Sequence, residues 1–347
     1  MPSGDSWSPG HAFILRVDDP VGLTGYLRQH GWLGATETVA SVAPAGDGNM
    51  NCTLRVDTGH RTLIVKQGRP WVERYPSIPA PPERTLVEAA FYGVVATSPA
   101  LAGAMPVRIG VDRDNRLLLL GDCVGFTDMT GVYEGTVVDG AAVDGLLAYL
   151  AGLHRLPVTD VHVAPFANRA MQELNHAYIF ALPMSFAPPV GARLDGLTPG
   201  LGRLAEALVA DRAYREAVMR LGDHYLHAAP RALVHGDYFP GSWLSRGGDV
   251  VVIDPEFCFA GAPEFDFGVM AGHLLLADQE ASLVARVWRA ASAHGYDLAL
   301  VAGHAGVEMM RRLIGVAQLP RLVRSLEQKQ ALLARSRRLV LGEERLG

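Results

Sequence analysis

Residues 233–268 decide the fold of this chain. They begin with Leu233-Val-His-Gly-Asp-Tyr-Phe-Pro-Gly-Ser242, pass a Gly247-Gly248 turn, and continue as Val252-Ile-Asp-Pro-Glu-Phe257 and Phe265-Asp-Phe-Gly268. The apolar residues before His235 predict a buried strand, which a short loop joins to a hairpin over residues 243–253. The hairpin would return the chain to the end of that strand, so that residues far apart in sequence meet at one edge.

Three carboxylates should meet at this edge. Asp237 lies in the loop after the strand, and Asp254 and Glu256 follow the hairpin. One carboxylate that can accept a proton, beside two that can hold a hard cation, indicates metal-assisted group transfer. The same carboxylates could instead activate water, so metal-dependent hydrolysis stays open.

The composition indicates an ordered protein with two lobes. A chain of 347 residues, 49% of them apolar, exceeds the size at which one core usually keeps growing. The net charge of -5 argues against a nucleic-acid groove, and no apolar run reaches membrane-spanning length. The three cysteines lie far apart without metal-ligand or redox spacing. We therefore expect a cytoplasmic protein that binds neither nucleic acid nor membranes.

The N-terminal part of the chain predicts a small antiparallel lobe built around a lysine. After a helix over residues 20–29, strands are expected at 38–42, 52–56 and 62–66, then a helix over 83–96 and a hairpin within 107–120. Of the 31 lysine and arginine residues, only Lys66 and Lys329 are lysine. Lys66 at the end of an apolar strand could therefore mark a site that needs a compact point charge, or it could be a lysine that survives there by chance.

Two further features of this lobe each have a functional and an ordinary interpretation. Glu88 in the predicted helix could face Lys66, as a helix glutamate does in kinases, or it could be a solvated surface residue. Glu83 is a rival for the same role. The loop Gly46-Asp-Gly-Asn-Met-Asn51 could close over a phosphate as a flap, or it could be a common hairpin turn.

The rest of the chain is predicted to be mostly helical. Helices are expected at about residues 139–155, 167–180, 200–228, 280–294, 299–319 and 321–340. We divide the chain into an N-lobe (residues 1–121), a glycine- and threonine-rich hinge (122–135) and a C-lobe (136–347) that carries the three carboxylates. The fold class is α+β.

Five stretches resemble, in order, the motifs of the aminoglycoside phosphotransferase and choline kinase family, and within it those of the 5-methylthioribose kinases. These stretches are residues 46–51, Ile64-Val-Lys-Gln67, residues 235–242, residues 252–268 and Arg311-Arg-Leu-Ile-Gly-Val-Ala317. The resemblance covers about residues 35–320. It implies a protein-kinase-like fold and transfer of the γ-phosphate of ATP, with Mg2+, to a hydroxyl of a sugar-like substrate.

The resemblance also implies roles for individual residues. Asp237 would be the catalytic base, and Asp254 and Glu256 would hold Mg2+ together with Ser242, which stands where most relatives have a metal-binding asparagine. Lys66, with Glu88, would hold the nucleotide phosphates under the flap residues Asp47, Gly48 and Asn49. Arg311 and Arg312 would serve the substrate end of the cleft.

The sequence does not determine the identity of the acceptor. Tyr238, Phe239 and Pro240 replace polar residues that the family has after the catalytic aspartate, which predicts a more aromatic acceptor pocket with Tyr238 in it. The acceptor could be methylthioribose, a nucleoside or an aminoglycoside antibiotic, and a nucleotide-binding pseudokinase is an alternative of another class. A homodimer is also possible, since the sequence does not determine the oligomeric state.

Overall fold

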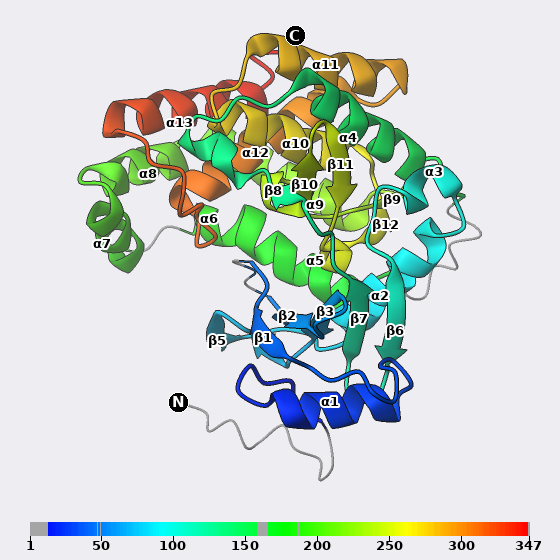
Figure 1. Cartoon of the computed structure of the whole chain (residues 1–347). Helices are drawn as coiled ribbons and strands as arrows, with labels where there is room; N and C mark the ends of the chain where they lie inside the picture. The colour runs from blue at the N-terminus through cyan, green and yellow to red at the C-terminus, as the bar shows by residue number, and fades with distance from the viewer. Residues whose placement is uncertain (1–12, 47, 49, 158–165, 186–187, 346–347) are drawn as a thin grey trace. The chain divides into compact units, whose positions relative to one another are not determined.

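We describe a computed structural model of the chain, which covers residues 13–46, 48, 50–157, 166–185 and 188–345. The chain divides into two compact units, residues 1–125 and residues 126–347. Figure 1 colours the first unit from blue to cyan-green and the second from green to red. Within the described residues, no helix has both the length and the apolar character needed to cross a membrane.

The first unit is built on an antiparallel sheet of five strands in the order β1-β2-β3-β7-β6. These strands are β1 (Ser41–Pro44), β2 (Cys52–Asp57), β3 (Thr62–Gln67), β6 (Arg108–Asp112) and β7 (Leu117–Gly121). The predicted strands are thus found, although the first begins three residues later than expected. A small hairpin of β4 (Trp71–Val72) and β5 (Tyr75–Pro79) precedes the helix that follows.

Three helices complete this unit: α1 (Pro20–Gln29), α2 (Arg84–Val95) and α3 (Pro99–Ala102). The Asp19 side chain accepts a hydrogen bond from the backbone N–H of Gly22 and so caps α1, and Pro20 is suited to its first turn. Leu23 and Leu27 of α1 pack into the same core as Leu54, Val56 and other buried residues of the sheet. This core fixes the sheet that carries Lys66.

The second unit is mostly helical and contains two small sheets. Its helices are α4 (Gly140–Leu153), α5 (Arg169–His176), α6 (Leu182–Met184), α7 (Pro188–Leu197), α8 (Leu201–Ala210), α9 (Arg212–His227), α10 (Glu264–Leu276), α11 (Ala281–Ala293), α12 (Leu298–Ile314) and α13 (Leu326–Val340). The helix expected over residues 200–228 is therefore two helices. Asp211 separates them because its side chain caps α9 by accepting from the N–H of Tyr214.

The two sheets of this unit contain the strands of residues 233–268. β9 (Ala232–Val234) pairs with β12 (Phe259–Gly261), and the hairpin of β10 (Trp243–Arg246) and β11 (Asp249–Val252) pairs with β8 (Thr127–Asp128). The predicted strand, loop and hairpin are thus confirmed. Pairing of Trp243 with Val252 returns the chain after the hairpin to the start of β10, as expected.

Helices α10 and α12 pack closely and form the centre of this unit (Figure 1). Every residue of α10 is buried. Gly268 and Gly272 permit the approach, because a Cβ at Gly268 would lie 2.4 Å from the Cβ of His304 and one at Gly272 would lie 2.9 Å from the carbonyl oxygen of Ala305. The close packing places the C-terminal turn of α12 beside the loop that follows β9.

Candidate functional site

The loop after β9 is held in a sharp turn at Gly236. Its backbone has φ +87°, and a Cβ there would lie 2.2 Å from the carbonyl oxygen of Phe257. Only glycine tolerates both the conformation and the close approach. The turn sets the direction of Asp237, the next residue.

Asp266 on α10 braces this loop. Its carboxylate accepts hydrogen bonds from the backbone N–H of His235 (2.8 Å) and of Gly236 (3.0 Å), and from His154 Nε2 (2.9 Å). His235 is buried and its Nε2 donates to the carbonyl of Ile253 (3.0 Å), while burial lowers the pKa of its imidazole. His235 and Asp266 therefore hold the loop in place.

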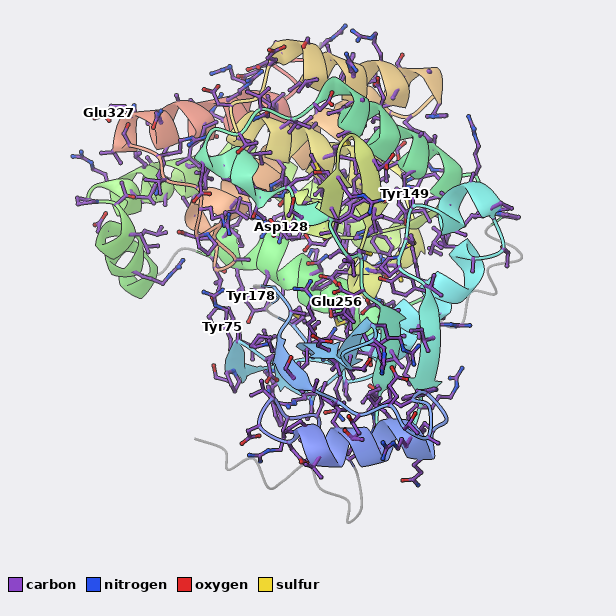
Figure 2. All side chains as sticks on the ribbon, in the orientation of Figure 1. Tyr75, Asp128, Tyr149, Tyr178, Glu256 and Glu327 are labelled. Atoms are coloured by element: carbon purple, nitrogen blue, oxygen red, sulfur yellow. The ribbon has the colours of Figure 1, made fainter. Side chains whose placement is uncertain are left out.

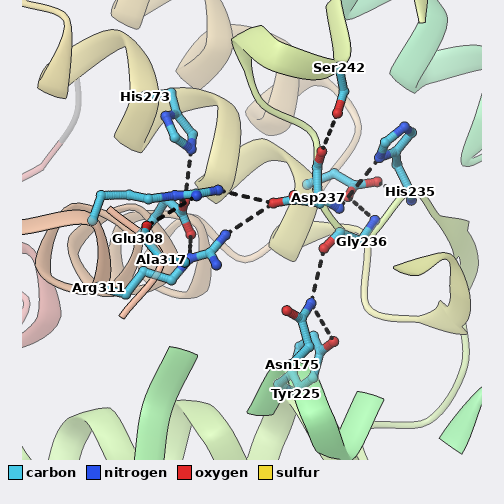
Figure 3. Close-up of polar contacts among 12 residues, drawn as sticks. Asn175, Tyr225, His235, Gly236, Asp237, Ser242, His273, Glu308, Arg311 and Ala317 are labelled. Carbon is cyan, nitrogen blue, oxygen red and sulfur yellow. Dashed lines mark hydrogen bonds and ion pairs between the residues drawn. The ribbon is translucent and has the colours of Figure 1, made fainter. Parts of the chain in front are cut away.

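Asp237 is joined to two arginines of α12. Its Oδ1 accepts from Arg311 Nη2 at 3.0 Å and from Arg312 Nη2 at 3.2 Å (Figure 3). Both guanidinium groups are almost completely buried, whereas the Asp237 side chain keeps 22% of its surface exposed. The three residues expected at the catalytic and substrate positions are thus brought together within one unit.

The expectation that Tyr238 lines the acceptor pocket is wrong. Tyr238 is completely buried, its hydroxyl donates to the carbonyl of Leu146 (2.9 Å), and its ring stacks parallel to Tyr149, which is labelled in Figure 2. Its neighbour Phe239 instead lies under the guanidinium of Arg312, 4.9 Å from the ring centroid. Phe239 is therefore the aromatic residue of this stretch that lies beside the arginine pair.

The predicted metal-binding residues lie in the same loop or in the 253–257 segment that contacts it. Asp254 follows β11 with a left-handed backbone (φ +62°, ψ +49°), and Glu256, labelled in Figure 2, lies two residues later in a buried turn. Ser242 is buried, and its hydroxyl donates to the backbone carbonyl of Asp237 at 3.1 Å. Ser242 thus has a structural role that the sequence did not reveal.

Asp254 and Glu256 can be compared with the ligands that a magnesium ion takes from proteins. In the part of the chain that the structure describes, no group of three or more His, Cys, Asp or Glu residues could hold a metal ion. Two carboxylates are nevertheless a common protein contribution to a Mg2+ site, because phosphate oxygens and water supply the remaining ligands. Asp254 and Glu256 are residues of that chemical type.

In the first unit, Lys66 on β3 and Glu88 on α2 form an ion pair. Lys66 Nζ lies 2.7 Å from Glu88 Oε1, and both side chains are buried. Glu83, the rival to Glu88, is exposed and lies instead near the half-buried Arg116, with an N to O distance of 3.5 Å. The geometry expected of Lys66 and Glu88 is therefore present.

The flap can be described only in part. Asp47 and Asn49 lie outside the described residues, and Gly48 is exposed. Arg84 fixes the C-terminal end of the flap, and this role was not predicted from the sequence. The buried Arg84 guanidinium donates to the carbonyls of Met50 (2.6 Å) and Trp71 (3.1 Å). A buried arginine at the first position of a helix has no sequence pattern that would identify it.

Three further residues of the site were not predicted from the sequence: Glu308, His273 and Asn175. Asn175 on α5 donates to the carbonyl of Gly236 at 3.2 Å, and Glu308 on α12 contacts both arginines and His273 (Figure 3). Glu308 lies three and four residues before Arg311 and Arg312, a spacing that places all three on one helix face. That spacing was the available signal.

Comparisons with known proteins show which family the sequence matches. The model of the phosphotransferase enzyme family matches residues 41–304. The methylthioribose kinase of Erwinia tasmaniensis is 26% identical over 350 residues, which cover 84% of this chain and 84% of that kinase. The methylthioribose kinase of Pectobacterium atrosepticum is 28% identical over 268 residues, which cover 72% of this chain but only 64% of that kinase.

Among solved structures, a spectinomycin phosphotransferase in complex with ADP and spectinomycin superposes with a TM-score of 0.51. The superposition covers 92% of this chain and 96% of that chain at 9% identity. At this identity the likeness concerns the fold alone. It confirms the predicted two-lobed α+β fold with a small antiparallel sheet and a larger helical part.

Proposed function

Because this chain belongs to the phosphotransferase enzyme family, we propose that it is a small-molecule kinase that transfers the γ-phosphoryl group of ATP to a hydroxyl of a sugar-like acceptor. Phosphoryl transfer requires positioning and charge neutralisation more than covalent chemistry. The residues described above are of the types that this reaction uses: a carboxylate base, a buried lysine and glutamate pair, and two arginines.

The arrangement around Asp237 carries this proposal. Its Oδ1 is occupied by Arg311 and Arg312, whereas Oδ2 accepts no hydrogen bond from the described residues. A carboxylate anchored by one oxygen presents the other in a fixed direction. Asp237 Oδ2 is therefore suited to accept the proton of an acceptor hydroxyl.

In the proposed reaction, the acceptor oxygen attacks the γ-phosphorus while its proton passes to Asp237 Oδ2. The bond between the γ-phosphorus and the oxygen that bridges it to the β-phosphorus breaks, and ADP leaves with that oxygen. Arg311 and Arg312 neutralise charge on the transferring group and prevent Asp237 from rotating. The proton is later lost to solvent, since the Asp237 side chain is partly exposed.

We assign the nucleotide phosphates to Lys66, which Glu88 holds in place, and to the flap with Asp47, Gly48 and Asn49. Asp254 and Glu256 would hold Mg2+, with Ser242 beside them, and the ion when bound would neutralise phosphate charge. In this assignment residues 1–121 bind the nucleotide, 122–135 form the hinge, and 136–347 carry the catalytic and acceptor residues.

For the acceptor we propose methylthioribose, because the two relatives reported above are methylthioribose kinases. The test is an ADP-release assay of the purified chain with ATP and Mg2+. The acceptors are methylthioribose, ribose, nucleosides and a panel of aminoglycosides. We expect rapid ADP release with methylthioribose alone. Faster ADP release with an aminoglycoside would indicate that the acceptor is an aminoglycoside and not methylthioribose. ATP binding without ADP release for any acceptor would indicate a pseudokinase.

A further inference from the structure

Glu308 is a buried carboxylate surrounded by three nitrogen donors. It is 1% exposed, and it accepts from Arg311 Nε (2.5 Å), Arg312 Nε (2.8 Å) and His273 Nε2 (2.8 Å). Burial alone would raise the pKa of Glu308, but the charges of Arg311 and Arg312 hold this pKa well below its usual value. Glu308 is therefore an ionised carboxylate at neutral pH.

The atoms that Glu308 contacts determine where the arginines point. It binds Nε of each guanidinium, which fixes the plane of the group and with it the position of the neighbouring Nη2 atom. Both Nη2 atoms reach the same oxygen of Asp237 (Figure 3). Glu308 and Asp237 thus hold each guanidinium at two neighbouring nitrogens, Nε and Nη2.

His273 fixes the remaining side of Glu308. Burial lowers the pKa of His273, so its imidazole is neutral at pH 7. Its Nε2 therefore carries the proton donated to Glu308, and its Nδ1 accepts from the Tyr133 hydroxyl at 2.7 Å. Glu308 cannot rotate without breaking a hydrogen bond to a donor on α10 or α12.

Packing restrains one of the arginines from a further side. The Arg312 guanidinium lies over the ring of Phe239, and that ring lies 5.4 Å from the ring of His273. Arg312 is therefore held by Glu308 at Nε, by Asp237 at Nη2 and by an aromatic face.

We propose that Glu308 is the positioning residue of this site: it aims the Nη2 atoms of Arg311 and Arg312 at Asp237 and at the phosphoryl group in transfer. The assignment rests on the proposed kinase function for its catalytic consequence, but the orientation of the arginines is a property of the protein alone. Glu308 itself touches neither Asp237 nor, in this account, any substrate.

The first test is the variant Glu308→Gln. Glutamine keeps the shape of the side chain, but its NH2 group would face an N–H donor, so one arginine must be released. A matched control is Glu264→Gln on α10. Glu264 is also a completely buried glutamate, but the arginine that it binds is Arg231, which does not belong to the site. We expect kcat/KM for the acceptor to fall about 100-fold in Glu308→Gln, as for a displacement of about 1 Å at a reacting group. The KM for ATP should stay within about twofold of wild type.

A second measurement does not depend on activity. Phenylglyoxal reacts with arginines that are accessible, and peptide mass spectrometry locates the modified residue. In Glu308→Gln we expect Arg311 or Arg312 to react several times faster than in wild type, whereas Glu264→Gln should leave both rates unchanged. If the wild-type chain phosphorylates no acceptor, the kinase proposal fails, and the labelling rates still decide the role of Glu308.

The variant Glu308→Asp keeps the test decisive if glutamine prevents folding. It retains the negative charge between the arginines but withdraws the carboxylate by one methylene from both Nε atoms. We expect the same loss of kcat/KM and the same faster labelling. Wild-type kinetics and wild-type labelling in a folded Glu308 variant would overturn the proposal.

Discussion

Arg311 Nη2 lies 3.0 Å from Oδ1 of Asp237. Arg311 belongs to the last turn of α12, and Asp237 belongs to the loop that follows β9, so this ion pair joins the loop to the helix. Both groups are largely shielded from water, and their attraction is therefore weakly screened by salt. The candidate base and the candidate substrate cations consequently behave as one structural unit.

Lys66 should be essential for turnover. Lys66→Met removes the charge that we assign to the nucleotide phosphates, and we expect kcat to fall at least about 100-fold while acceptor affinity is preserved. Lys329→Met is a matched control, because Lys329 is the other lysine of the chain and its Nζ donates to Thr198. Steady-state kinetics with varied ATP and varied acceptor measure both effects. Similar losses in the two variants would remove Lys66 from the site.

Asp266 should support both the stability and the activity of the protein. Asp266→Asn leaves one acceptor oxygen for three donors, from His235, Gly236 and His154. We expect a loss of about 2–4 kcal/mol in the free energy of unfolding and a fall in kcat of about tenfold or more. Urea unfolding and kinetics check the two parts. Loss of stability with an unchanged kcat would mean that Asp266 does not orient the loop.

His304 should make the protein less stable in mild acid. Among the described residues neither ring nitrogen has a hydrogen-bond partner, and burial lowers its pKa from 6.5 to about 3. His224 lowers this pKa further, and Glu264 opposes the shift. Below about pH 6.5, His304 therefore takes up a proton in the unfolded chain but not in the folded chain. The free energy of unfolding consequently falls as pH decreases, by up to about 1.4 kcal/mol per pH unit.

The variant His304→Leu removes this contribution. We expect its free energy of unfolding to fall less than that of wild type between about pH 7 and about pH 5 in urea titrations. The exposed His60 provides the control variant His60→Leu, which should follow wild type. Identical pH slopes for wild type and His304→Leu would refute the assignment.

Removal of either candidate metal ligand should raise the concentration of Mg2+ that turnover needs. For Asp254→Asn and Glu256→Gln we expect the concentration of Mg2+ at half-maximal rate to increase at least about tenfold. Asp249→Asn, an exposed position at the start of β11, should not change it. Rates measured over a Mg2+ titration decide this, and an unchanged midpoint in both ligand variants would exclude the two carboxylates.

The framework of the site could be predicted from sequence because local patterns specify it. Glycines mark the hairpin turn and the bend at Gly236. The apolar run before Lys66 identifies the strand that carries this lysine, which forms an ion pair with Glu88. The family resemblance supplied the order of the parts, and the match over residues 41–304 confirms the family itself.

The remainder depends on tertiary packing. Tyr238 and Phe239 are neighbours in a loop without periodicity, and only the packing of Tyr238 against Tyr149 and Trp243 decides which of them faces the core. Glu308 and His273 meet through the close approach of α10 and α12. Because α12 is buried on all sides from Val301 to Ile314, hydrophobic periodicity could not single out the face that carries Glu308.

The most direct test of the central claim is product formation by wild type and by Asp237→Asn. Purified protein is incubated with ATP, Mg2+ and methylthioribose, and mass spectrometry of the acceptor detects the added phosphate. Asp211→Asn, which alters another Asp–Arg ion pair, is the control. The account predicts a phosphorylated sugar with wild type and the control, and a rate about 10²–10⁴-fold lower with Asp237→Asn, whose ATP binding by calorimetry is retained. An undiminished rate in Asp237→Asn would contradict it.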